Sequence, residues 1–363
     1  MNRVPATLVL SDGAQFEGYA AGFLPRSGVT TGEFVFNTAL SGYQETITDP
    51  SYAGQIIAFT YPHIGNYGVT PLDEEAGRPW CSGVVVRELS DLPSNWRSVG
   101  PLEGFLVQHR VPAIVGIDTR RLTRHLRRYG ALPGAFGHAD PAAVAAAARV
   151  AVGTDGTDLV SQVTTRETYQ RGDGSRHVVA LDYGIKTTMV HQLARRFRVS
   201  VVPATMDADA IRALAPDGLF LSNGPGDPGA LDAQVQVLDD LVGTLPIFGI
   251  CLGHQLLARS LGATTYKLPF GHHGSNHPVK DLMTGRVEIT AQNHNYAVAA
   301  DSLGRSEVSH VNLNDGVVEG LTATALGCFS VQYHPEAGPG PHDARYLFDR
   351  FEALVNDGIT ESH

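Results

Sequence analysis

The sequence contains very little cysteine, with three residues among 363, namely Cys81, Cys251 and Cys328. Because they are scattered and odd in number, they indicate neither a disulfide framework nor a zinc-binding spacing, and a reducing cytoplasm fits best. The chain also lacks any apolar stretch near the roughly 20 residues that span a bilayer. Its first residues lack the apolar core of a secretory signal, so we expect no membrane association and no export.

An excess of basic charge and nucleotide-binding loops are missing as well. The formal net charge is -10, which argues against nucleic acid as the main partner. The sequence has no G-x-x-x-x-G-K-[ST] loop or other recognisable nucleotide cradle, so we expect no cofactor in this chain. The histidine-rich segment 271–277 has no local carboxylate or cysteine to complete a ligand set, so we predict no metal site. The arginines at 120–128 are interpreted as a solvated helix face, with docking to an acidic partner as the alternative.

The length of the chain suits two domains of ordinary size. Residues 1–150 indicate a mixed β/α domain, with many short strands followed by two helices that begin near Asp118 and Asp140. Residues 151–176 are polar and contain glycine, so we predict a linker there. From 177 to 363 strands alternate with helices, which indicates an α/β domain with a parallel sheet and right-handed crossovers.

A cysteine between two glycines ends an apolar run, in Gly249-Ile250-Cys251-Leu252-Gly253. The run predicts a buried strand and the following residues predict a helix, so the pattern is the cysteine counterpart of the G-x-S-x-G nucleophile elbow. A helix N-terminus lowers the pKa of a nearby thiol, and the thiolate is the reactive form. The pattern therefore favours Cys251 as a nucleophile, with a buried structural cysteine as the alternative.

A histidine and a glutamate follow a second predicted strand, in the segment 330–336. If the chain stays extended, His334 and Glu336 point to the same side. A carboxylate beside an imidazole fixes its tautomer and stabilises its protonated form. Cys251, His334 and Glu336 together would supply a nucleophile, a base and an orienting group. The alternative for His334 is a satisfied histidine at a strand end.

These residues also carry a family resemblance. The segments 249–255 (G-I-C-L-G-H-Q), 333–336 (Y-H-P-E) and 221–228 (L-S-N-G-P-G-D-P) resemble the class I glutamine amidotransferases. Five N-terminal segments resemble the small subunit of carbamoyl phosphate synthetase: 36–38, 42–45, 48–52, 61–66 and 117–120. The resemblance covers nearly the whole chain. It implies a class I amidotransferase domain at 177–363 with a mostly parallel, flavodoxin-like sheet.

The resemblance also implies a function. L-glutamine is hydrolysed through a thioester on Cys251, with His334 and Glu336, and ammonia passes to a large synthetase subunit. That partner uses ATP, Mg and bicarbonate to make carbamoyl phosphate for arginine and pyrimidine synthesis. Residues 1–150 would dock this subunit and complete the glutamine site, in a heterodimer or a higher hetero-oligomer. By resemblance the glutamine contacts are Ser51, Gly224, Gly226, Leu252, Gln255, Asn293, Asn295 and Tyr296.

One position departs from the family pattern, and other functions stay open. Relatives usually carry Gly-Phe or Gly-Tyr where this chain has Asn295-Tyr296; asparagine tolerates left-handed backbone better than most residues, so it could supply the same backbone contacts. The rival functions are the amidotransferase part of another synthetase, a non-catalytic scaffold subunit, and a cysteine hydrolase that acts alone. The N-terminal segments argue against the first rival, and the presence of Cys251, His334 and Glu336 argues against the second.

Overall fold

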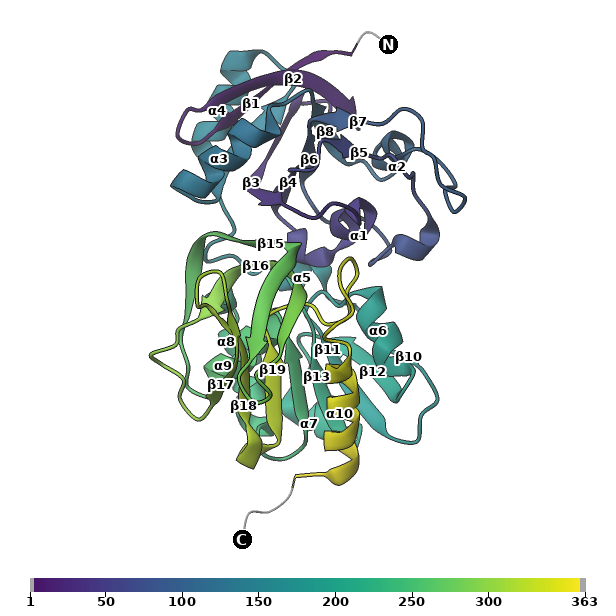
Figure 1. Ribbon diagram of the computed structural model, residues 1–363, viewed down its shortest axis with the longest axis vertical. Coiled ribbons are helices and arrows are strands. Elements are labelled where there is room, and N and C mark those ends of the chain that lie inside the picture. The colour runs from purple at the N-terminus through teal and green to yellow at the C-terminus, as the bar shows by residue number, and fades with distance from the viewer. Residues whose placement is uncertain (1–2, 360–363) are drawn as a thin grey trace. The chain divides into compact units, whose positions relative to one another are not determined.

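The computed structural model describes residues 3–359, which form two compact units (Figure 1). The first unit comprises Met1–Asp155 and a short returning segment, Pro269–His273. The second comprises Gly156–Leu268 and Gly274–His363. Within residues 3–359, no helix combines the length and the apolar character needed to cross a membrane.

The stretch 151–176, which the sequence predicts to be a linker, contains regular structure. It holds α5 (Val160–Val163) and β10 (Tyr169–Arg171). The strand β10 pairs antiparallel with β12 (Arg198–Pro203), so it forms an edge of the second unit's sheet. Short polar segments of this kind carry too weak a periodicity for a three-residue strand to be recognised.

The first unit is a closed barrel with the strand order β1-β2-β8-β6-β4-β3-β9. Its central strands are apolar and alternate between two clusters: Phe34 and Phe36 pack in one, and Val35 packs in the other. Two helices begin where the sequence predicts, because Asp118 and Asp140 cap α3 and α4 through hydrogen bonds from backbone N–H groups. The strands are β1 (Pro5–Leu10), β2 (Gln15–Gly22), β3 (Val29–Asn37), β4 (Gln55–Phe59), β6 (Gly83–Val86), β8 (Pro112–Val115) and β9 (Leu132–Gly137), beside the small ladder of β5 (His63–Ile64) and β7 (Glu88–Leu89).

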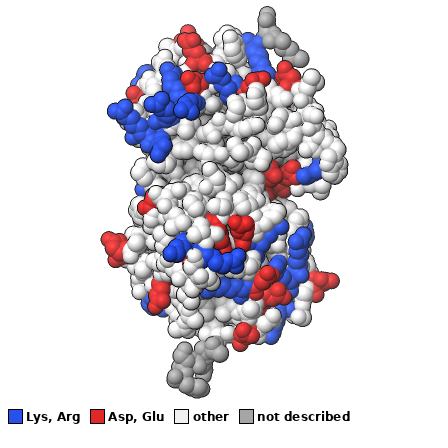
Figure 2. Space-filling view, viewed as in Figure 1, with Lys and Arg blue, Asp and Glu red and all other residues white. Residues whose placement is uncertain are grey.

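The helices of the first unit flank this barrel. Basic side chains gather over α3 (Figure 2), and Arg120, Arg124, Arg127 and Arg128 are exposed, as a solvated helix face requires. The fifth, Arg121, lies over the ring of Phe16. The helices are α1 (Tyr43–Thr48), α2 (Leu102–Gln108), α3 (Thr119–Tyr129) and α4 (Pro141–Val150), with 3-10 turns at Pro50–Tyr52 and Pro71–Asp73.

The second unit contains a ten-stranded sheet that is parallel at its centre. The parallel strands lie in the order β12-β11-β13-β14-β19. This is the 2-1-3-4-5 order of flavodoxin-like folds, so the predicted fold class is confirmed. Antiparallel strands extend the sheet beyond β19. The bounds not yet given are β11 (His177–Asp182), β13 (Gly218–Leu221), β14 (Ile247–Ile250), β15 (Thr265–Asp281), β16 (Val287–Val298), β17 (Glu307–Asn312), β18 (Val318–Ala323) and β19 (Cys328–Val331).

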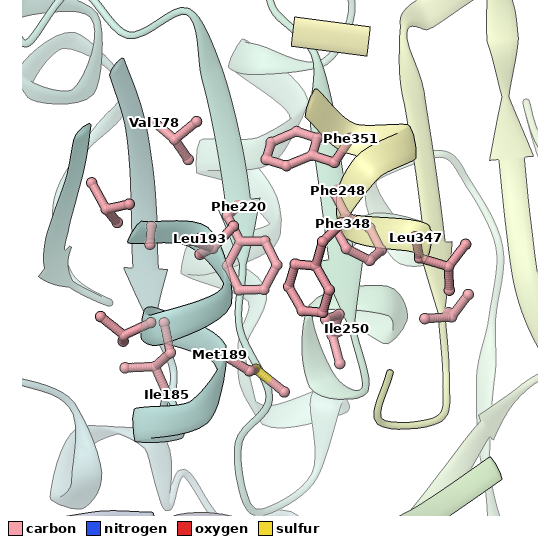
Figure 3. Close-up of a cluster of buried hydrophobic side chains, with 14 of the residues drawn as sticks. Val178, Ile185, Met189, Leu193, Phe220, Phe248, Ile250, Leu347, Phe348 and Phe351 are labelled. Atoms are coloured by element: carbon pink, nitrogen blue, oxygen red, sulfur yellow. The ribbon is translucent and has the colours of Figure 1, made fainter. Parts of the chain in front are cut away.

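Helices cover both faces of the parallel strands, which explains why these strands are apolar throughout. On one face Phe220 and Phe248 pack against residues of α6 and α10, among them Met189 and Phe351 (Figure 3). On the other face, neighbouring strand residues such as Leu221 pack against α7, α8 and α9. These helices are α6 (Thr187–Ala194), α7 (Ala208–Ala213), α8 (Asp232–Leu241), α9 (Leu252–Ser260) and α10 (Tyr346–Asp357), with 3-10 turns at Pro228–Ala230 and Thr324–Leu326.

Candidate active site

Cys251 occupies the predicted corner between strand β14 and helix α9. Its backbone has φ 54° and ψ -106°, which places a non-glycine residue in a sparsely populated region. The flanking glycines allow the corner to close. A Cβ atom on Gly249 would lie 2.7 Å from the Gly253 carbonyl oxygen, and one on Gly253 would lie 2.3 Å from the Leu221 carbonyl oxygen. The strand-to-helix corner inferred from the sequence is therefore confirmed.

His334 and Glu336 meet by a different route from the one the sequence predicts. The His334 Nδ1 and the Glu336 Oε1 lie 2.8 Å apart, and both side chains are buried. The backbone, however, leaves the extended conformation after Val331 and turns, with a hydrogen bond from the Ala337 N–H to the His334 carbonyl. The expectation of an extended segment is wrong, and a turn brings the two side chains together.

A buried lysine completes the group around Glu336. The Lys186 Nζ lies 2.8 Å from the same Glu336 Oε1 and also donates to the Gly338 carbonyl. Its backbone N–H donates to the Asn223 Oδ1 at 3.3 Å. Sequence reasoning missed Lys186, although one signal was present: it lies just past the carboxyl end of a parallel strand, where ligand sites form.

Burial and charge together set the protonation of this group. Burial alone would lower the pKa of His334, but the Glu336 carboxylate and hydrogen bonding with Cys251 and Glu336 raise it to about 10. Burial alone would raise the pKa of Glu336, yet Lys186 and His334 lower it to about 2. At neutral pH His334 is therefore an imidazolium beside the Glu336 carboxylate.

Three of the predicted glutamine contacts, Gln255, Asn293 and Tyr296, take part in contacts between helix α9 with its preceding Cys251 and strand β16. The Cys251 Sγ lies 3.5 Å from the Asn293 carbonyl oxygen. The Gln255 side-chain amide donates to the Tyr296 carbonyl at 2.9 Å and to the Gln332 Oε1 at 3.0 Å. These bonds fix strand β16 against helix α9, so the side chain of Gln255 positions the backbone beside the cysteine.

The glycine loop after β13 approaches the same corner. A Cβ atom on Gly224 would lie 2.3 Å from the Tyr183 carbonyl oxygen and 2.8 Å from the Leu252 side chain. Gly226 has φ 90°, and its Cβ would lie 2.8 Å from the Thr157 carbonyl oxygen. Packing of the protein itself thus requires glycine at both positions, besides any approach of a substrate.

Asn295 and Ser51, two further predicted glutamine contacts, are both buried. Asn295 is buried within strand β16, and its φ is not positive, so the expected use of a left-handed conformation is wrong. Ser51 belongs to the first unit, where it is buried and its N–H donates to the Asp49 Oδ1 at 2.9 Å. Its contact with glutamine remains a prediction.

Two family models match this chain, one in each unit. Residues 179–354 match the model of the class-I glutamine amidotransferases. Residues 8–136 match the CPSase domain of the carbamoyl-phosphate synthase small chain. The chain therefore belongs to the family of carbamoyl phosphate synthase small chains, and its second unit is a class I glutamine amidotransferase domain.

The relatives match over nearly their full lengths. The chain is 50% identical to the carbamoyl phosphate synthase small chain of Chlorobaculum tepidum, over 98% of this chain and 99% of that protein. It is 51% identical to the one of Symbiobacterium thermophilum, over 96% and 98%. It is 46% identical to the pyrimidine-specific small chain of Bacillus subtilis, over 96% and 95%.

Proposed function

We propose that this chain hydrolyses L-glutamine through a thioester on Cys251 and passes the ammonia to a large synthetase subunit. The observation that carries the proposal is the buried Cys251 at a strained corner together with His334 held by Glu336. The large subunit would make carbamoyl phosphate from bicarbonate and ATP, with Mg, for arginine and pyrimidine biosynthesis. The family name "small chain" supports such a partner, and the name of the Bacillus subtilis relative supports the pyrimidine branch.

In the first half-reaction the Cys251 thiolate attacks the side-chain amide carbon of glutamine. The carbonyl π electrons move to oxygen, and a tetrahedral oxyanion forms. The backbone N–H groups of Leu252 and Gly224 would receive this oxyanion; donors of this kind contribute about 3 to 4 kcal/mol in comparable sites. The His334 imidazolium then gives its proton to the nitrogen, the C–N bond breaks, and ammonia leaves a glutamyl thioester.

In the second half-reaction His334, now neutral, accepts a proton from water as the water oxygen attacks the thioester. The C–S bond breaks, glutamate leaves, and both the thiolate and the imidazolium are restored. Glu336 keeps the Nδ1–H of His334 directed at its own carboxylate, so Nε2 is the atom that exchanges the proton. Lys186 anchors Glu336 and so positions His334 through it.

Release of ammonia explains the need for a partner. Ammonia in water near neutral pH is mostly protonated and is then no nucleophile. Direct transfer to a second active site avoids this loss.

The three cysteines are free thiols, as a reducing cytoplasm would keep them. We therefore place the reaction in the cytoplasm.

The thioester can be trapped. When the chain, in complex with a matching large chain, turns over labelled glutamine and is quenched in acid, the peptide containing Cys251 should carry a glutamyl group. Hydroxylamine should release it. The peptide containing Cys328 is the internal control and should stay unmodified. Rapid glutamine hydrolysis with no label on Cys251 at any quench time would contradict the covalent route.

A further inference from the structure

Strand β11 ends in a buried carboxylate, that of Asp182, which is 5% exposed. Its two oxygens accept three backbone N–H groups. Oδ1 accepts from Gly184 at 2.9 Å and from Ile185 at 2.7 Å, and Oδ2 accepts from Thr165 at 2.7 Å. Hydrogen bonds to a charged acceptor are roughly twice as strong as those between neutral groups. Asp182 therefore fixes the turn that follows β11 and joins it to a segment earlier in the chain.

The turn after β11 lies against the glycine loop and leads to Lys186. Gly184, within the turn, has φ 131°, a conformation that favours glycine. A Cβ atom on Gly184 would lie 3.3 Å from the Cα atom of Gly224, so the two backbones pack closely. At the end of the turn, the Lys186 Nζ lies 2.8 Å from the Glu336 Oε1. The shape of the turn therefore determines where the lysine meets this carboxylate.

The same turn is hydrogen-bonded to the loop after β13, which carries the proposed oxyanion donor Gly224. The Tyr183 N–H donates to the Ser222 Oγ at 2.9 Å. The Ser222 carbonyl in turn accepts from the Gly253 N–H at 2.9 Å, within the cysteine corner. The turn after β11 therefore contacts the loop of the oxyanion donor and, through its lysine, the carboxylate that orients the histidine.

Part of the stretch that the sequence predicts to be a linker belongs to the same arrangement. The Thr165 N–H donates to Asp182, as described above. Nine residues earlier, the Gly156 N–H donates to the Asp227 Oδ2 at 2.9 Å. Asp227 follows the glycine loop directly. The segment 156–165 is therefore bound at both ends to loops at the carboxyl ends of the parallel strands, where ligand sites form.

We propose that Asp182 is a positioning residue for glutamine hydrolysis, because it holds the turn after β11 against the oxyanion loop and places Lys186 on Glu336. This inference rests on the proposed function, which supplies the reaction. Asp182 acts through these neighbours and not on glutamine itself. A displacement of catalytic groups by about 1 Å can cost about 10²-fold in rate. The loss should appear in kcat, because the positioned groups act on the transition state.

Asp182→Asn tests this role in the complex with a matching large chain. The substitution preserves the size of the side chain but places an amide NH₂ opposite a backbone N–H. We expect glutamine-dependent kcat, per site titrated to completion with a glutamine-like chloroketone, to fall about 30-fold with KM nearly unchanged. Ammonia-dependent synthesis should persist. The matched control is Asp217→Asn: the Asp217 Oδ2 accepts the His177 N–H at 2.7 Å at the opposite end of β11. It should keep the wild-type kcat per site.

A second pair of variants removes a single hydrogen bond and leaves Asp182 in place. Thr165→Pro deletes the N–H that binds Oδ2. The preceding residue, Thr164, has φ -59° and ψ 148°, values that a residue before proline adopts readily. Thr165→Ala keeps the N–H and is the control. We expect Thr165→Pro to lower kcat per titrated site by about fivefold, less than Asp182→Asn, and Thr165→Ala to behave like the wild type.

Titration of the active site separates positioning from folding. A residue with a purely structural role would cost titratable sites and leave the rate per site at the wild-type value. Wild-type kcat per site in both Asp182→Asn and Thr165→Pro, or an equal loss in the Asp217→Asn control, would overturn this inference and leave the proposed function intact. A wild-type chain that never makes glutamine usable by the large chain would overturn the proposed function together with this inference.

Discussion

Replacing Cys251 by alanine should abolish glutamine-dependent synthesis by the complex and leave ammonia-dependent synthesis intact. The expected loss with glutamine is more than about 10⁴-fold, as for other enzymes that lose their nucleophile. The reason is local: Cys251 is the residue at the corner between β14 and α9, and the large chain's own chemistry is untouched. Initial rates with glutamine or ammonium chloride as the only nitrogen donor measure both effects.

Two control variants make the result specific to one thiol. Cys81 and Cys328 are also buried free cysteines, and for both burial raises the pKa of the thiol to about 12. Cys81→Ala and Cys328→Ala should therefore keep glutamine-dependent activity. A glutamine-like chloroketone should alkylate the wild type and both controls but not Cys251→Ala. Undiminished glutamine use by Cys251→Ala would refute the thioester mechanism.

Replacing His334 by glutamine should lower glutamine-dependent kcat by at least about 10³-fold, the contribution of a well-placed proton donor and acceptor. Ammonia-dependent synthesis should again persist. His191→Gln, an exposed histidine on α6 of the same unit, is the control and should behave like the wild type. Retention of more than a tenth of the wild-type rate in His334→Gln would assign the proton transfers to another group.

The contribution of His334 to the stability of the folded wild type has a defined pH dependence. The pKa of His334 is raised from 6.5 to about 10, so its proton stabilises the folded state fully below pH 6.5. This contribution declines above pH 6.5 and is lost as the pH rises through about 10. The free energy of unfolding of the wild type should thus approach that of His334→Gln near pH 10. Glu336 has the opposite sign: its pKa is lowered from 4.5 to about 2, so its contribution is present above pH 4.5 and is lost as the pH falls through 2.

The local part of the site could be predicted from the sequence, because short-range rules determine it. Gly249 and Gly253 predict a corner that only small residues can flank, and the structure shows the carbonyl oxygens that exclude a Cβ there. The alternation of side chains along a strand predicts the contact between His334 and Glu336. In the structure the contact forms in a turn instead. Two residues that are separated by one position meet in either conformation, so a correct contact did not require a correct backbone.

The distant parts could not be predicted in this way. Lys186 reaches Glu336 across 150 positions, and no periodicity links them. Closure of the barrel depends on β9, which pairs with both β1 and β3. The short segment 269–273 joins the first unit because its carbonyl groups accept hydrogen bonds there, from Thr38 and Ala131. Such pairings are decided by tertiary packing, which residue propensities do not report.

The most direct test of the account is carbamoyl phosphate formation by a matching large chain, measured with and without this chain. With ammonia, the large chain should work in either case. With glutamine, synthesis should appear only when this chain is added, and its rate should saturate at one chain per large chain. If ammonia supports synthesis but glutamine never does, even with both chains at high concentration, the claim that this chain supplies nitrogen from glutamine is contradicted.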